Sequence, residues 1–307
     1  MGLRENGMRR QSRRTSGFTL LIMELALCLS ALPMLAQNTG AGTSSAPPSS
    51  PQAPGAATNS SDDQLRKAAE NPLANLVNVP IQNTSSFESG EYGRTQNIAK
   101  IEPVVPVRLS SNWNLIVRAI QPLTWQPDDK APTGMTFGLG DLNPSFFISP
   151  EYPGKIIWGA GPVFVFPTGT NAALGSGKFS IGPTAAVLTQ PGPWTLGVLM
   201  NNYWSVAGFS DRKNVNQMLI QYFLSYNFKR GWYLTSSPIS TANWMEPSGK
   251  RWVVPLGGGI GRLVLLGPQA AKLSVQVFGN VVNPPNASPW SLRFQFALLY
   301  PKKSSSD

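Results

Sequence analysis

The stretch Gln217-Met218-Leu219-Ile220-Gln221-Tyr222-Phe223-Leu224-Ser225-Tyr226-Asn227 decides the fold class of this chain. Every second residue from Met218 to Tyr226 is apolar or aromatic. The opposite face of the stretch carries Gln217, Gln221, Ser225 and Asn227. A period of two predicts a β-strand with one apolar wall and one polar wall. The same alternation recurs in Phe179–Val187 and Leu292–Tyr300, so it is a repeated feature of the chain.

Strand length and number distinguish two all-β folds that share this pattern. A soluble β-sandwich has strands of about five or six residues, whereas a tilted membrane strand needs about 9–11. We predict twelve long segments, at 73–83, 96–109, 113–123, 137–149, 155–166, 178–189, 194–206, 215–227, 232–243, 251–265, 272–281 and 290–300. Bacterial membrane barrels have an even number of antiparallel strands. The sequence therefore predicts a closed antiparallel transmembrane β-barrel of about 12 strands.

The predicted connections indicate the same fold independently. Counted from the first predicted strand, the odd-numbered connections are long: 84–95, 124–136, 167–177, 207–214, 244–250 and 282–289. The even-numbered connections are short: 110–112, 150–154, 190–193, 228–231 and 266–271. Membrane barrels have long outer loops and short periplasmic turns. The alternation therefore predicts an outer-membrane protein with both termini in the periplasm.

The nine Trp residues fall near the ends of predicted strands. Those near the short turns are Trp113, Trp158, Trp194 and Trp232, and those near the long loops are Trp125, Trp204, Trp244, Trp252 and Trp290. Membrane barrels carry two aromatic girdles where amphipathic rings lie between lipid and water. The alternative is that these are ordinary core tryptophans of a globular protein.

Composition excludes several classes of function. The chain has 307 residues, only 13% of them charged, against about 25% in typical globular domains. Its formal net charge is +10, but the basic residues are scattered, so we expect no nucleic-acid partner. There is no His, which removes His-based catalysis and His metal ligands, and the one Cys, Cys28, lies in the region of the expected export signal. We therefore expect no enzyme, no metal site and no cofactor.

The N-terminal region has the features of an export signal. Arg4–Arg14 is rich in basic residues, Phe18–Leu35 is mostly apolar, and Ala36 supplies a small residue for cleavage. We expect a signal peptide over 1–36. The alternative is a transmembrane helix, which the charge of Glu24 and the polar stretch that follows disfavour.

The expected organisation continues with a linker, a barrel and a tail. Residues 37–70 form a disordered periplasmic linker, because Asn38–Asn59 lacks the apolar periodicity needed to offset ordering entropy. A short helix with an acidic start is expected at Gln64–Glu70. The barrel spans 71–301 and the tail 302–307. The last strand, ending at Tyr300, resembles the C-terminal signal read by the barrel assembly machinery, although the tail departs from that pattern.

Several segments together carry a family resemblance. They are Asn71–Leu76, Val79–Asn83, Pro103–Pro106, Trp113–Ile116, Phe137–Asp141, Trp158–Pro162, Gly182–Thr184 and Gly192–Thr195. As a set they resemble a bacterial family often labelled, misleadingly, "neuromedin U", which is related to the outer-membrane proteins of the phenol meta-cleavage pathway. The resemblance covers about residues 70–301. It implies an outer-membrane barrel and a transport role, with outer-membrane lipid as a partner, and it brings no catalytic residues.

The strand pattern predicts which charged residues face the barrel interior. An Arg or Lys facing lipid at mid-depth costs about 2–4 kcal/mol, so charged residues within the strands are expected in the lumen. The candidate lumen-lining residues are Lys100, Glu102, Arg108, Arg118, Asp141 and Arg293. They form either an internal salt-bridge network that plugs the barrel or a polar lining that selects solutes.

Two other motifs have structural interpretations. Gly257-Gly258-Gly259-Ile260-Gly261 superficially resembles a phosphate-binding loop, but it lacks the Gly-Lys-Ser/Thr ending. Glycines within a barrel strand more often relieve curvature or mark a bulge. Asp128-Asp129 lies in what we expect to be the longest outer loop, and we interpret this pair as solvated turn residues.

The sequence therefore favours a channel or transporter for small solutes, which the family resemblance suggests are hydrophobic or aromatic. Twelve strands lie between the eight that close on side chains and the sixteen that leave an aqueous channel. The alternative is a non-transporting barrel with a structural or adhesive role.

Overall fold

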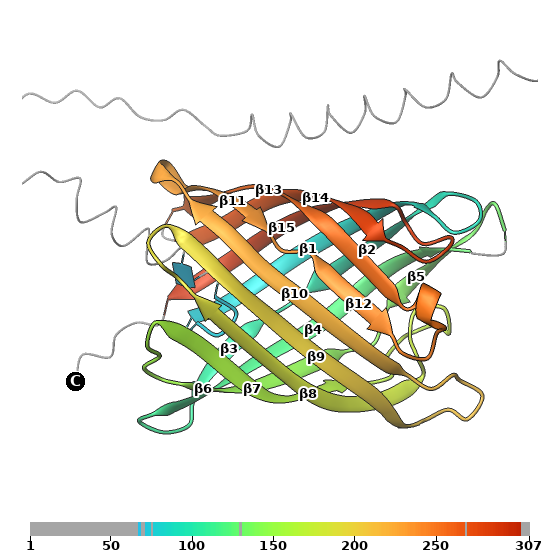
Figure 1. The fold of residues 1–307 in the computed structure, drawn as a ribbon, viewed down its shortest axis with the longest axis horizontal. Coiled ribbons are helices and arrows are strands. Elements are labelled where there is room, and N and C mark those ends of the chain that lie inside the picture. The colour runs from blue at the N-terminus through green and yellow to red at the C-terminus, as the bar shows by residue number, and fades with distance from the viewer. Residues whose placement is uncertain (1–66, 69–70, 75, 129–130, 268, 302–307) are drawn as a thin grey trace, which may run out of the picture. The chain divides into compact units, whose positions relative to one another are not determined.

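The computed structural model describes residues 67–68, 71–74, 76–128, 131–267 and 269–301. They form a single antiparallel sheet whose strands are steeply tilted (Figure 1). Its strands are β1 (Leu76–Ser89), β2 (Arg94–Ile101), β3 (Val104–Arg108), β4 (Trp113–Pro127), β5 (Met135–Leu139), β6 (Asn143–Pro150), β7 (Ile156–Val165), β8 (Lys178–Thr189), β9 (Trp194–Gly208), β10 (Asn216–Asn227), β11 (Trp232–Ser236), β12 (Ile239–Asn243), β13 (Trp252–Leu266), β14 (Gln269–Val282) and β15 (Trp290–Pro301). Two short 3₁₀ turns, η1 (Lys229–Gly231) and η2 (Ser248–Lys250), lie between strands.

The sheet closes on itself, because the first strand pairs with the last. Register runs from Leu76 opposite Pro301 to Phe87 opposite Trp290. Three of the long barrel strands are interrupted, so β2 with β3, β5 with β6, and β11 with β12 each serve as one, which makes a twelve-stranded barrel. A proline, which cannot donate to a strand ladder, lies in two of the breaks, at Pro103 and Pro238. The closed barrel confirms the predicted fold class.

The barrel has two distinct ends. At the short-turn end lie Leu76, Pro301 and the connections that follow β3, β6, β8, β10 and β13 (Figure 1). At the long-loop end lie the connections that follow β1, β4, β7, β9, β12 and β14. Most of the predicted alternation is therefore present.

Two predicted connections are wrong. The first strand extends to Ser89, so the connection to β2 is only 90–93, not 84–95. Thr84–Ser86 are all small and polar, so the sequence shows no alternation from which a strand could be predicted there. They nevertheless pair with both β15 and β2. The longest loop is 166–177, after β7, and not the loop that contains Asp128.

The outer wall of the barrel is apolar, with aromatic residues at both ends. Trp113 and Trp158 meet edge to face at the short-turn end, with centroids 6.1 Å apart. Trp244 and Trp252 meet in the same way at the long-loop end, at 5.7 Å. None of the nine Trp is buried, and Trp158 is 42% exposed. Two aromatic girdles are therefore present, and the interpretation as core tryptophans is wrong.

The glycine-rich stretch lies within β13, as the sequence analysis expected. The pairing of β13 with β14 shifts register between Val254 and Pro255, just before the glycines. Gly261 faces the barrel interior, where the ring of Tyr233 occupies the space that a Cβ would need. The Tyr233 hydroxyl donates to the carbonyl of Leu273 across the wall, at 2.9 Å. Gly261 therefore leaves room for the Tyr233 ring inside the barrel.

Within the described residues, no helix is long and apolar enough to cross a membrane. The expected signal peptide, most of the linker and the tail at 302–307 lie outside the described residues, as does Asp129. Of the short helix expected at Gln64–Glu70, only Lys67 and Ala68 are described, and both are helical.

Candidate functional site

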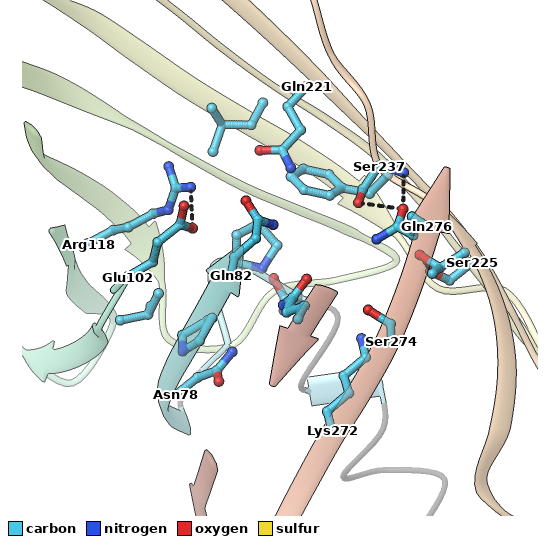
Figure 2. A pocket seen from close by; sticks show the side chains of 18 of the residues that line it. Asn78, Gln82, Glu102, Arg118, Gln221, Ser225, Ser237, Lys272, Ser274 and Gln276 are labelled. Carbon is cyan, nitrogen blue, oxygen red and sulfur yellow. Dashed lines mark hydrogen bonds and ion pairs between the residues drawn. The ribbon is translucent and has the colours of Figure 1, made fainter. Parts of the chain in front are cut away.

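A polar cavity of about 110 Å³ lies inside the barrel. Asn78 and Gln82 of β1, Gln221 and Ser225 of β10, and Ser274 and Gln276 of β14 line it (Figure 2). These side chains come from inward-facing positions, where the period of two places the polar residues of each strand. Leu199 and Phe223 add a small apolar surface to the same cavity.

Glu102 and Arg118 form an ion pair on one side of the cavity. The Arg118 Nη2 donates to Glu102 Oε2 at 3.0 Å, and both side chains are nearly buried (Figure 2). Glu102 lies in the break between β2 and β3, where its backbone N–H still donates to the carbonyl of Pro80, at 2.9 Å. The break before Pro103 thus holds the carboxylate beside β4 without leaving that N–H unpaired.

A second polar group comes from β14, β15 and the break between β11 and β12. The Gln276 Oε1 accepts hydrogen bonds from the backbone N–H and the hydroxyl of Ser237, each at 3.1 Å (Figure 2). The Arg293 Nη1 donates to the carbonyl of Ser237 at 2.8 Å, and its guanidinium lies over the ring of Phe278 at 4.7 Å. The break at Pro238 therefore exposes a carbonyl that a buried arginine uses.

Several charged side chains lie in or near the cavity. Lys272 projects into it, with its ammonium 4.5 Å from the centre of the Tyr233 ring. Lys100 lies two residues before Glu102 in the sequence. Both Lys100 and Arg293 interact electrostatically with the Glu102 carboxylate. Three cations, Lys100, Arg118 and Arg293, therefore lie near the carboxylate of Glu102.

The structure brings together four of the six residues that the sequence predicted to line the lumen: Lys100, Glu102, Arg118 and Arg293. Arg108 does not join them. It lies exposed at the end of β3, where its Nε donates to the carbonyl of Ser110 at 3.2 Å. The alternation of the strand predicts that the Arg108 side chain points inward. Because Arg108 is the last residue of β3, its side chain reaches solvent instead.

Asp141 is also apart from the cluster and anchors the longest loop. Its Oδ1 accepts from the N–H of Gly169 at 3.0 Å, and its Oδ2 accepts from the N–H and hydroxyl of Ser176 at 2.6 and 2.7 Å. The loop 166–177 packs against Gly138 and Gly140, next to Asp141. Arg212 of the next loop donates to its carbonyls at Ala172 and Ser176, at 2.7 and 3.2 Å. Asp141 therefore fixes a loop over the long-loop end.

The short-turn end is filled by residues that precede β1. Leu73 is buried in a cluster with inward-facing residues of several strands, among them Ile116, Phe147 and Leu199. It also lies against Gly159 of β7, on which a Cβ would approach its methyl groups to 3.1 Å. Gln190, in the turn between β8 and β9, donates to the carbonyl of Lys67 at 2.7 Å. The segment before β1 thus crosses the end of the lumen.

Sequence reasoning missed Lys272, Gln276 and Ser237. The first two lie on the inward face of β14, and the spacing Lys272, Ser274, Gln276 within the predicted strand 272–281 is the signal that could have identified them. The predicted strand began at 272, whereas β14 begins at Gln269. Ser237 carries no sequence signal, because its role depends on the break at Pro238.

The described residues of the cavity include neither His nor a cluster of metal ligands. The sequence contains no His. Among the described residues, no three His, Cys, Asp or Glu side chains gather closely enough to hold a metal ion. Most of the polar groups that line the cavity are neutral amides and hydroxyls, which both donate and accept hydrogen bonds.

The fold and the lumen define a class of protein: a closed antiparallel barrel with an apolar, girdled exterior and a polar interior. No family model and no curated protein sequence match the chain. Solved structures do match it. An outer membrane channel from Pseudomonas putida F1 is 15% identical, covers 73% of this chain and 95% of its own, and has a TM-score of 0.56.

Two further matches are more distant. A NanC porin is 8% identical and covers 74% of this chain and 100% of its own, with a TM-score of 0.47. The outer membrane phospholipase A from Escherichia coli is 13% identical and covers 74% of this chain and 92% of its own, with a TM-score of 0.39. The likeness to the Pseudomonas channel shows a shared barrel fold.

Proposed function

We propose that this protein is a channel of a bacterial outer membrane through which small solutes pass. The observation that carries the proposal is the reversal of polarity across one closed sheet. The outside has exposed apolar side chains between two aromatic girdles, and the inside holds charged residues around a polar cavity. A closed barrel also satisfies every strand hydrogen bond within itself, as lipid demands.

The proposed orientation places the short-turn end and both termini in the periplasm. Barrels of this class have short periplasmic turns and longer external loops, which supports this direction. The loops that Asp141 and Arg212 hold together would then face the outside of the cell. The barrel assembly machinery is the proposed partner during biogenesis.

The narrower family and the solute class rest on resemblance. The similarity to the "neuromedin U"-labelled family and to the phenol meta-cleavage outer-membrane proteins suggests hydrophobic or aromatic solutes. Leu199 and Phe223 in the cavity are compatible with such solutes. The likeness to the outer membrane channel from Pseudomonas putida F1 supports a transport role for this chain.

One observation favours the alternative, a barrel with a structural or adhesive role. The short-turn end of the lumen is occupied by the segment before β1. A channel therefore requires that this segment leave room for a solute. We propose no enzymatic activity, because the chain contains no His.

Two measurements test the proposal. Membrane fractionation should place the mature protein in the outer membrane, and the purified protein should give discrete conductance steps in a planar lipid bilayer. A protein that stays in the soluble periplasmic fraction would contradict the location. Outer-membrane location without conductance or solute uptake would establish the structural alternative, and phospholipid hydrolysis by the purified barrel would refute the non-enzymatic assignment.

A further inference from the structure

We propose that the outer wall of the barrel contains a binding site for an anionic phospholipid, whose phosphate lies against Arg262 and whose acyl chain lies in a neighbouring groove. This inference rests on the proposed outer-membrane location and names a lipid that the wall selects there. It starts from Arg262, a charged residue on the otherwise apolar outer face of β13. Gly261 and Leu263 on either side of it are buried, whereas Arg262 itself is exposed, so its side chain points away from the lumen.

The position of Arg262 on the wall indicates what it contacts. An arginine that faces lipid is costly at mid-depth and is tolerated near the edge of the apolar band. The register places Arg262 opposite Trp232, a girdle residue, and its guanidinium carbon lies 5.1 Å from the centre of that ring. On its other side Arg262 is opposite Leu273 of β14, an exposed apolar residue. The guanidinium is therefore held at the level of the aromatic girdle, where lipid headgroups begin.

Two further cations lie in the same sector, and no acidic residue balances them there. η1, which directly precedes Trp232, contains Lys229 and Arg230, and both are exposed. The elements β10, η1, β11 and β13 contain no Asp or Glu. Within the part of the chain that the structure describes, no carboxylate forms an ion pair with any of the three cations. Clusters of Lys and Arg beside an apolar membrane surface attract anionic lipid headgroups.

A groove of about 540 Å³ lies on the outer wall beside these cations. Its large side chains are Trp194, Leu224, Tyr226 and Leu234, and the small residues Ser236 and Gly259 leave the space between them. Leu234 follows Trp232 by two residues and pairs with Ile260, which precedes Arg262 by two. At a rise of about 3.3 Å per residue, the groove therefore begins about 7 Å from Arg262, towards the middle of the wall.

The two parts of this surface together fit a phospholipid better than another copy of the chain. The groove accepts an acyl chain, and the cations beside it accept the phosphate. Two copies inserted in the same direction and related by a two-fold axis would bring the same patch of each chain together. Such a contact places Lys229, Arg230 and Arg262 opposite their own copies, and like charges disfavour it.

Native mass spectrometry of the purified protein in a neutral detergent tests the headgroup site. Retention of phosphatidylglycerol is compared with that of phosphatidylcholine, which has no net charge, with identical acyl chains. Because each Lys or Arg near an anionic lipid surface strengthens the attraction about fivefold, we expect a preference of about fivefold or more for phosphatidylglycerol. The variant Lys229→Gln/Arg262→Gln should bind the two lipids nearly equally. Arg108→Gln/Lys155→Gln removes two exposed charges at the same end of other strands and should keep the preference.

A second pair of variants tests the groove. Ser236→Leu fills it with a side chain and should lower phosphatidylglycerol retention severalfold. Ala160→Leu enlarges an exposed residue of the outer wall on β7, outside the groove, and should leave retention unchanged. Each variant should first show the heat-dependent gel mobility of a folded barrel. The single variants Lys229→Gln and Arg262→Gln serve if the double variant does not fold.

Three results would overturn the inference: equal retention of the two lipids by the wild type, an intact preference in Lys229→Gln/Arg262→Gln, or full retention by Ser236→Leu. A dimer that Ser236→Leu abolishes would also overturn it, because the groove would then hold a second copy. The lipid result is separable from the proposed channel. A conducting outer-membrane protein without lipid preference contradicts this site alone, whereas a protein that prefers phosphatidylglycerol but gives no conductance contradicts the channel alone.

Discussion

Arg118 on β4 binds Glu102, which lies outside any strand in the break between β2 and β3, through a hydrogen bond of 3.0 Å. The exposed fractions of the two side chains are only 12% and 11%. The pair therefore joins two neighbouring barrel strands at the point where the backbone ladder between them is interrupted at Pro103.

Removing one partner of this pair should destabilise the barrel more than removing both. Glu102→Ala leaves the Arg118 guanidinium nearly buried without its anion, and such a change costs about 3 kcal/mol or more. The double variant Glu102→Met/Arg118→Met should recover part of that loss, because it removes the buried guanidinium together with the carboxylate, whereas Lys100 and Arg293 still lose their interaction with Glu102. Urea unfolding of the folded barrel in detergent measures both changes. Equal losses in the single and double variants would show that the pair contributes no coupling.

Gly261 and Tyr233 provide a test of the packing inside the wall. Gly261→Ala places a Cβ where the Tyr233 ring lies, and overpacking of this kind costs about 2 kcal/mol. Gly279→Ala is the control, because nothing lies within 4 Å of the Cβ it would add on the adjacent strand β14. We expect a lower urea midpoint for the first variant and little change for the second. Similar midpoints would mean that the ring moves aside at little cost.

Much of this fold could be predicted from the sequence, because a strand of alternating polarity needs only its own residues to show which face is apolar. The stretch from Gln217 to Asn227 illustrates this, since it differs from β10 by a single residue at one end. β1 was harder to predict. Its outer half, Thr84–Ser86, is polar on both faces and is held by its neighbours on each side, so its strand character depends on partners far along the chain.

The site was predictable only where charge and strand parity coincide. Lys100, Glu102 and Arg118 have a clear inward parity, and the closed barrel brings them together. The hydrogen bond between Asp141 and Ser176 joins residues 35 apart in the sequence. Ser176 lies in a loop without a periodic pattern, so nothing in the sequence indicates this contact. The breaks at Pro103 and Pro238 also shift side chains in ways that a regular alternation does not describe.

The apolar outer face and the polar inner face of the barrel predict how well an introduced charge is tolerated at each position. Met200→Lys places an ammonium on the exposed outer face near the middle of β9, where lipid contact should cost about 2–4 kcal/mol. Gln221→Lys on the neighbouring strand β10 points into the polar cavity and should be tolerated better. The yield of folded protein in lipid vesicles, read from gel mobility, compares the two. A better yield for Met200→Lys than for Gln221→Lys would reverse the assignment of the faces.

The carboxylate of Asp141 should control the order of two loops at once. Asp141→Ala removes three hydrogen bonds to Gly169 and Ser176, and bonds to a charged acceptor contribute about 1.5–3 kcal/mol each. Because Arg212 is bonded to the same loop, it should become accessible as well. We expect trypsin to cleave after Arg212 several times faster in this variant. Glu91→Ala, in the exposed connection after β1, should cleave at the wild-type rate, and an equal rate in both variants would refute the role of Asp141.

Leu73 should determine whether the short-turn end of the lumen is open. Its side chain is buried against the inner faces of strands on the far side of the barrel, and burial of a Leu contributes about 1.5–3 kcal/mol. Leu73→Ser weakens that contact and changes no residue of the barrel wall. The segment before β1 should therefore leave the lumen more often. Single-channel recording should show a higher conductance or a longer open time than wild type. Leu109→Ser, which changes an exposed residue in a turn at the same end, is the matched control. If both variants conduct as wild type does, the segment leaves a path beside it, and the limit on passage lies elsewhere in the lumen.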